Sequence, residues 1–296
     1  MKDQKSSVIS NALNIARETG SEKLFLFLNS EQECRWFAKS AFKDAGTIVV
    51  VIPADIELKA ADQSAPYPVI SSWSGNQSRF SRIKYAFLRG VMQGIIGPDS
   101  KVVCVLGPHG KTHLDTITIH DLGLSWSEDF PFDVKAIIHN RAFYTIMAVV
   151  DIALDIGALG REGKSVGTIF VIGDTDSVMD MSHQVVFNPF RDYPKEERLI
   201  TLMEVVESIK ELAKLDGAII ISEDGVVEAA GRFLEASGVV TKKLRGLGAR
   251  HRSAAGITRK TEAVAIVVSE STGRVTIFQK GRMIAALEPV ISRRME

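Results

Sequence analysis

The order of apolar and polar positions in the first part of the chain predicts short buried strands that alternate with helices. Continuous apolar runs of this kind are typical of strands covered on both faces, which indicates a parallel sheet. We therefore expect a small α/β layer domain in this part of the chain. Its expected strands are 24–28, 47–53 and 101–107. A helical pattern follows Ser6 and Ser7 and stops near Gly20, further helices are expected over 31–44 and 79–96, and 57–78 is expected to be a loop.

The second part of the chain adds hairpin signals to the same alternation. Asp224–Gly225 and Lys280–Gly281 are dipeptides typical of tight turns between antiparallel strands. We therefore expect a mixed sheet flanked by helices, and the fold class is α/β in both parts. We place one domain at 1–128 and the other at 129–292. The expected strands are 134–139, 167–173, 218–222, 263–269 and 274–278, and the expected helices are 141–159 and 194–215.

Composition narrows the classes of function. The 296 residues carry 36 Lys and Arg and 36 Asp and Glu, so the formal net charge is zero. This balance argues against a nucleic-acid polymer or an anionic membrane surface as the partner. The most apolar helical segment, 143–158, is interrupted by Asp151 and Asp155, and the first residues lack a long apolar run. With two cysteines, Cys34 and Cys104, expected to be buried and inert, we expect a cytoplasmic protein.

Two segments of the first part resemble functional motifs only weakly. The sequence Gly-Pro-His-Gly-Lys-Thr at 107–112 follows a strand, but a phosphate-binding loop needs a glycine where Val105 stands. We interpret it as an ordinary polar turn. His109, His113 and His120 lie near one another in sequence, but Pro108 and Gly110 argue against a helix that would align them. We expect structural or solvated side chains rather than a metal site.

A basic window stands out against the neutral total. No acidic residue occurs from Ala236 to Thr261, whereas the window holds seven basic ones. Glycines precede Arg250, His251 and Arg252, where a helix rich in small residues is expected to begin. A helix start offers free backbone N–H groups, and arginine adds a planar fork that suits phosphate oxygens. The window therefore predicts a small polyanionic ligand such as a nucleotide triphosphate.

Two carboxylate-bearing segments flank this window. Asp216-Gly217-Ala218 lies where a long helix is expected to meet a buried strand, and the simpler interpretation is a helix stop. Ser269-Glu270-Ser271-Thr272-Gly273 follows another strand, and the simpler interpretation is a polar hairpin turn. A carboxylate at either place would suit a divalent cation, but each segment alone predicts little.

Together, these segments resemble the diadenylate cyclase domain. The resemblance is carried by 216–218, by Gly248-x-Arg250-His251-Arg252, by Ser269-Glu270-x-Thr272-Gly273 and by Gly231-Arg232-Phe233-Leu234, and it runs from about 141 to 290. Segments 167–174 and 188–190 further resemble archaeal-type members. In these, a domain similar to the C-terminal domain of pyruvate kinase precedes the cyclase. The first part of this chain resembles that domain by its α/β alternation rather than by a specific motif.

The resemblance implies an enzyme that condenses two ATP into cyclic di-AMP and two pyrophosphates, with Mn²⁺ or Mg²⁺ as cofactor. Asp216 would bind the metal with help from Glu270, and Gly217 would lie against the ribose. Many relatives carry Thr where this chain has Ala249. The implied catalytic residues are Asp216, Arg250, His251 and Arg252, and the implied ATP-binding residues are Gly217, Ala218, Leu234, Gly248, Ala249, Arg250, His251, Arg252 and Ser269.

The product also bears on the assembly. Cyclic di-AMP is symmetric and one chain carries one set of motifs, so we expect a homo-oligomer with active sites face to face. Two alternatives remain open at this point. One is an adenine-nucleotide sensor or scaffold whose catalysis has lapsed, and the other is a separate catalytic site in the first domain. We favour a regulatory or assembly role for that domain.

Overall fold

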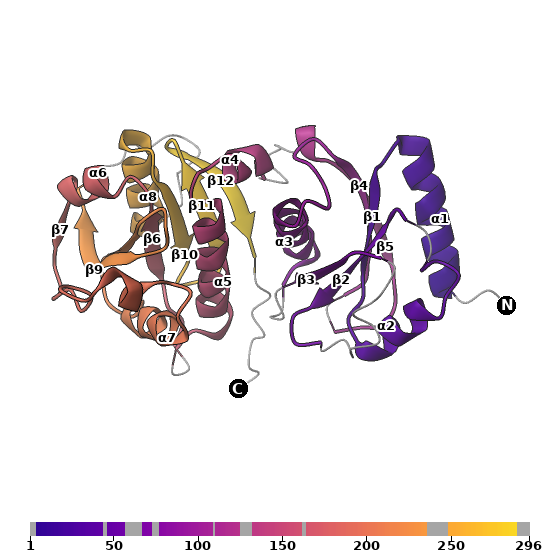
Figure 1. Ribbon diagram of the computed structural model, residues 1–296, viewed down its shortest axis with the longest axis horizontal. Helices are drawn as coiled ribbons and strands as arrows, with labels where there is room; N and C mark the ends of the chain where they lie inside the picture. The colour runs from indigo at the N-terminus through magenta and orange to yellow at the C-terminus, as the bar shows by residue number, and fades with distance from the viewer. Residues whose placement is uncertain are drawn as a thin grey trace. The chain divides into compact units, whose positions relative to one another are not determined.

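The first structural unit, Met1–Ile138, contains a five-stranded sheet in the order β3-β2-β1-β4-β5 (Figure 1). β1, β2, β3 and β4 are parallel, and β5 is antiparallel at the edge. The computed structural model describes residues 4–43, 46–56, 67–72, 77–108, 110–124, 132–161, 164–235 and 248–288. The elements are α1 (Gln4–Thr19), β1 (Lys23–Phe27), α2 (Glu31–Ala38), β2 (Ile48–Pro53), β3 (Val69–Ser72), α3 (Arg79–Met92), β4 (Lys101–Leu106), β5 (Thr116–Asp121) and α4 (Val134–Ile138), with a 3-10 turn at Leu122–Leu124.

Alternation along the strands divides the core of this unit between the two faces of the sheet. Leu24 and Leu26 of β1 pack with Ile9 of α1 and Phe37 of α2 on one face. Phe25 points the other way and contacts Phe87 of α3, with their ring centroids 5.7 Å apart. Helices therefore cover both faces, which confirms the buried parallel sheet expected from the continuous apolar runs.

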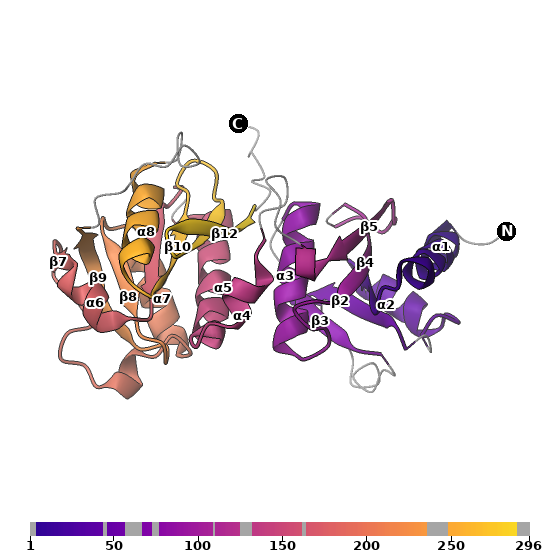
Figure 2. The same ribbon diagram turned by 90° about the horizontal axis from the view of Figure 1, so that it is seen from above.

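The second unit, His139–Glu296, contains a seven-stranded mixed sheet in the order β12-β11-β10-β6-β8-β9-β7 (Figures 1 and 2). β6 and β8 are parallel, and the remaining neighbours are antiparallel. This confirms the mixed sheet flanked by helices. The elements are α5 (Phe143–Leu159), β6 (Thr168–Ile172), α6 (Thr175–Asp180), β7 (Ser182–Gln184), a 3-10 turn (Lys195–Arg198), α7 (Met203–Leu212), β8 (Ala218–Ile221), β9 (Val227–Leu234), α8 (Ala249–Lys260), β10 (Val264–Val268), β11 (Val275–Gln279) and β12 (Arg282–Leu287).

Small residues allow α8 to pack closely on this sheet. Ala254, Ala255 and Ile257 of α8 are buried against side chains such as Ile220 of β8 and Val267 of β10. α5 contacts β10 and β11 and, with α7, covers the other face, as the two views show. The helix that carries the arginines is therefore anchored by its apolar face, while its first turn lies at the edge of the sheet.

Two expected elements differ from the structure. Segment 134–139 forms the helix α4 rather than a strand, because the Asp133 carboxylate accepts a hydrogen bond from the amide of Ala136 and so caps a helical turn. The single helix expected over 194–215 is interrupted before α7. Leu199 is extended there and pairs with Val226, so contact with the neighbouring strand replaces the local helical preference.

The structure also contains elements that the apolar pattern did not reveal. β3 lies within the expected loop and pairs with β2, and β5 follows the glycine-containing turn after β4. β7 is three residues long, which is too short for periodicity to detect. These are edge strands whose side chains are only partly buried, so their sequences need not be continuously apolar. Among the described residues, no helix is long and apolar enough to cross a membrane.

Candidate functional site

The sequence motifs meet at one edge of the seven-stranded sheet, where its central strands β10, β6 and β8 begin or end. β8 begins there after Asp216 and Gly217, β6 begins there after Gly167, and β10 ends there before Ser269. The register accounts for this meeting, because β6 pairs with β10 from Thr168↔Val268 and with β8 from Ile169↔Ala218. Because β10 runs antiparallel to its neighbour, its C-terminal end brings a carboxylate to the edge where two parallel strands begin.

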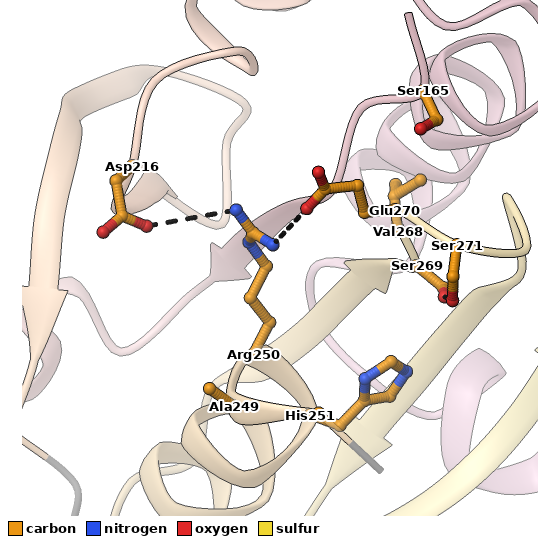
Figure 3. Close-up of a pocket in the computed structure, with 10 residues that line it drawn as sticks. Ser165, Asp216, Ala249, Arg250, His251, Val268, Ser269, Glu270 and Ser271 are labelled. Carbon is orange, nitrogen blue, oxygen red and sulfur yellow. Dashed lines mark hydrogen bonds and ion pairs between the residues drawn. The ribbon is translucent and has the colours of Figure 1, made fainter.

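A cavity of about 610 Å³ lies at this edge, bounded by the start of α8 on one side and the segment after β10 on the other (Figure 3). Seven of its lining residues are among those singled out from the sequence. Ser271 lies within the segment 269–273 but was given no role, and Ser165 and Val268 belong to no motif. The lining residues are Ser165, Asp216, Gly248, Ala249, Arg250, His251, Val268, Ser269, Glu270 and Ser271.

Arg250 lies between two carboxylates in this cavity. Its Nη1 atom lies 3.2 Å from Oε2 of Glu270, and its Nη2 atom lies 4.0 Å from Oδ1 of Asp216. Figure 3 shows the guanidinium extending from the first turn of α8 toward both groups. The Arg250 side chain is 35% exposed, whereas those of Asp216 and Glu270 are 90% and 60% exposed. The carboxylates therefore remain accessible to a ligand from solvent.

Gly167 makes room for this arrangement. A Cβ atom added there would lie 2.7 Å from Cβ of Glu270 and 2.9 Å from Nη1 of Arg250. Both distances are shorter than van der Waals contact allows, so any larger residue would displace the ion pair. The sequence contained no signal for this role, because the glycine precedes an apolar strand and is far from both partners along the chain.

His251 lines the cavity but is largely buried. Its ring packs edge-on against Phe278, with the centroids 6.0 Å apart and an interplanar angle of 74°. Burial lowers the pKa of His251, and the positive charge of Arg274 lowers it further. The imidazole is therefore neutral at physiological pH, and it can act as a hydrogen-bonding group rather than as a cation.

The first turn of α8 favours an anionic ligand. The capping position, Gly248, provides no side-chain hydrogen bond, and the turn contains no acidic residue. The first backbone N–H groups of a helix have no partner within it, and the helix dipole is positive at this end. Arg250 and Arg252 add positive charge where the dipole disfavours it. A bound anion would offset both, which is a physical reason to expect phosphate here.

Other predicted residues lie outside the cavity lining. Arg252 is exposed on α8, because residues two positions apart on a helix point in different directions. The Leu234 and Ala218 side chains belong to the apolar core beneath the site. Leu234 ends β9, and the register Ala218↔Arg232 brings that end of β9 beside the start of β8. The part of the basic window from 236 to 247 lies outside the described residues, as does His109.

Gly217 immediately precedes β8 and lies close to the backbone of the neighbouring strand β9. Its φ is +111°, and an added Cβ would lie 2.6 Å from the carbonyl carbon of Gly231. We expect Gly217→Ala to lower the free energy of unfolding by about 2–3 kcal/mol, because a backbone contact cannot move aside easily. Urea unfolding measures this. Gly248→Ala is the control, since its added Cβ meets nothing within 4 Å and the expected loss is at most about 1 kcal/mol. Equal losses in the two variants would contradict the prediction.

The carboxylates present suit a hard divalent cation only in part. Among the described residues, no group of three or more His, Cys, Asp or Glu side chains is placed to hold a metal. Asp216 and Glu270 are two oxygen-donor side chains, and Mg²⁺ is commonly bound by one or two carboxylates together with substrate phosphates. The donor set thus fits Mg²⁺ or Mn²⁺ if phosphate oxygens and water complete the coordination.

Comparison with known proteins identifies relatives along nearly the whole chain. The DAC family, described as "DisA bacterial checkpoint controller nucleotide-binding", matches residues 155–283. A diadenylate cyclase from Methanocaldococcus jannaschii is 33% identical over 94% of this chain and 91% of its own length. One from Haloferax volcanii is 30% identical over 90% of this chain and 93% of its own. A solved structure of DacA from Staphylococcus aureus is 25% identical with a TM-score of 0.31, over 50% of this chain and 87% of that one.

Proposed function

The chain belongs to the diadenylate cyclase family of nucleotidyltransferases, and from this premise we propose that it condenses two ATP into cyclic di-AMP and two pyrophosphates. In each half of the reaction, the 3′-oxygen of one ATP attacks the α-phosphorus of the other. A new P–O bond forms, the bond to the β-phosphate oxygen breaks, and pyrophosphate leaves with the electron pair. The protein must mainly position the nucleotides and neutralise charge.

The observation that carries this proposal is the meeting of Asp216, Arg250 and Glu270 in one cavity at the start of α8. These groups come from three separate segments, and each suits one part of a metal–triphosphate ligand. Arg250 and the free N–H groups of the first turn would hold phosphate oxygens. His251, being neutral, would donate or accept a hydrogen bond there.

The two carboxylates would hold Mn²⁺ or Mg²⁺. The ion supplies charge neutralisation and lowers the pKa of the 3′-hydroxyl when it is bound. Asp216 would orient this hydroxyl, and Gly217 would lie beside the ribose with no side chain to interfere. Ser269 follows β10 at the cavity and would bind phosphate, and Arg252 would reach phosphate from its exposed position on the same helix turn.

The adenine ring would lie near the end of β9. Leu234 would contribute backbone groups, since its side chain is buried in the core. Ala218, Gly248 and Ala249 would shape the nucleotide site by their small size. The hydroxyl that many relatives carry at position 249 is absent here, so the backbone N–H of Ala249 would take its part.

We assign the cyclase chemistry to the second domain, 129–292, and a regulatory or assembly role to the first, 1–128. The first domain would correspond to the one that resembles the C-terminal domain of pyruvate kinase. Because each ATP acts as both nucleophile and electrophile, two cavities must face each other across a two-fold axis. The proposed enzyme is therefore active only as a homo-oligomer.

The test is conversion of ATP in the presence of Mn²⁺ or Mg²⁺, followed by chromatography over a dilution series. We expect cyclic di-AMP and pyrophosphate in a ratio of one to two, with specific activity that falls as the oligomer dissociates. Activity that stays constant in a demonstrably monomeric species would overturn the face-to-face arrangement. Unchanged ATP after long incubation of the oligomer would instead favour a sensor or scaffold.

A further inference from the structure

We propose that, in the nucleotide-free protein, the Arg250 guanidinium occupies the position between Asp216 and Glu270 that a divalent metal ion would take. The metal therefore binds productively only as a complex with ATP. The inference rests on the proposed function, and it specifies the form of the substrate and the order of its arrival. It assigns Arg250 a second role, in which the same side chain first shields the carboxylates and then binds phosphate.

The ion pairs support the first of these roles. Nη1 and Nη2 of one guanidinium face the two carboxylates, at 3.2 Å from Glu270 and 4.0 Å from Asp216. Arg250 thus forms an ion pair with both carboxylates at once. A divalent cation shared by the same carboxylates would lie beside this positive charge. Metal and guanidinium therefore compete for one place.

The surroundings favour the arginine when nucleotide is absent. Gly167 leaves the space into which the Glu270 side chain and Nη1 of Arg250 fit. The carboxylates that a metal could use here belong to two side chains that are 90% and 60% exposed, and among the described residues no group of three or more His, Cys, Asp or Glu side chains is placed to hold a metal. A free divalent ion would have to give up water for few ligands and repel a cation as well. Neither cost is offset without phosphate.

When the triphosphate binds, the metal ion rather than the guanidinium is favoured beside the two carboxylates. Arg250 begins from the first turn of α8, where unpaired backbone N–H groups also point toward a bound anion. The phosphate oxygens offer the guanidinium new bidentate acceptors, while the divalent ion that they carry replaces it as the positive charge beside the two carboxylates. Once Arg250 moves to phosphate, Asp216 and Glu270 can hold the ion that the triphosphate carries. The exchange leaves every charge in the cavity with an opposite partner.

The test measures binding of free Mn²⁺ to the nucleotide-free protein by electron paramagnetic resonance, which reports the unbound ion directly. We expect weak binding by the wild type and at least about fivefold tighter binding by Arg250→Gln, because the competing charge is removed. Arg250→Lys keeps the charge and is expected to bind as weakly as the wild type. Adding Asp216→Asn to Arg250→Gln is expected to remove the gain.

Arg259→Gln is the matched control, because it removes the same charge from the same helix at an exposed position in its last turn, outside the cavity lining. Its Mn²⁺ affinity is expected to stay within about twofold of the wild type, since exposed charges are screened by salt. An Arg250→Gln protein that binds Mn²⁺ no more tightly than the wild type would overturn the proposal. An equal gain in Arg259→Gln or in Arg250→Lys would overturn it as well.

The outcome is independent of whether the proposed reaction occurs. A wild-type protein that makes cyclic di-AMP while Arg250→Gln shows no gain in Mn²⁺ affinity refutes only the shielding role. A wild-type protein that makes no cyclic di-AMP refutes the proposed function, and the metal-binding comparison then still decides whether Arg250 shields the carboxylates.

Discussion

Asp216→Asn is expected to abolish synthesis of cyclic di-AMP while leaving ATP binding nearly intact. The asparagine has almost the same size, and the Asp216 side chain is 90% exposed, so the fold should not change. The amide is a poor ligand for a hard cation and cannot help to lower the pKa of the 3′-hydroxyl. We expect turnover to fall by at least about 10²-fold, in the range seen when one group that stabilises developing charge is removed.

Turnover is measured by chromatography with saturating ATP and Mn²⁺, and binding by calorimetry with a non-hydrolysable ATP analogue. Asp224→Asn is the matched control, because this exposed carboxylate follows the opposite end of the same strand, β8. It is expected to retain wild-type turnover. Parallel losses of binding and turnover in Asp216→Asn would contradict the assignment of this carboxylate to the chemical step.

Arg250→Ala is expected to have the largest effect on nucleotide binding. It removes the guanidinium that lines the cavity beside Asp216 and Glu270, and it leaves the N–H groups of the first turn of α8 to bind phosphate. Loss of charge-assisted hydrogen bonds worth about 1.5–3 kcal/mol corresponds to an affinity decrease of about 10- to 100-fold. The same calorimetric titration checks this value.

The control for Arg250→Ala is Arg259→Ala. Arg259 is an exposed arginine in the last turn of α8, so its loss changes the net charge equally but at the far end of the helix. Its ATP affinity is expected to stay close to that of the wild type. If both variants lost affinity equally, the effect would reflect overall charge rather than a contact with phosphate.

Much of the site was predictable because its residues carry unusual local chemistry. An acid-free window with glycines before Arg250 and His251 indicated an anion site at a helix start, and the structure places α8 there. Asp216 and Glu270 were weak signals alone, since a helix stop and a hairpin turn explain them equally well. Only their order relative to the basic window made them informative.

The residues that escaped prediction act through space rather than through local pattern. Ser165 lines the cavity, and Gly167 admits the Arg250–Glu270 pair, yet both lie far along the chain from the other residues of the cavity. The apolar periodicity also did not predict which of the two arginines, Arg250 or Arg252, enters the cavity. A helix rotates by about 100° per residue, so two arginines in one motif point in different directions, and the packing of α8 decides which one enters the cavity.

The sequence by itself determined the α/β class, the buried parallel strands and the mixed sheet, because apolar periodicity and turn residues are local properties. It also determined which residue types were available for phosphate and metal. The tertiary structure alone decided that Asp216, Arg250 and Glu270 meet, since the register of β10, β6 and β8 aligns the ends of strands far apart in sequence. It likewise decided that an arginine lies between two carboxylates, which is a matter of distance rather than of pattern.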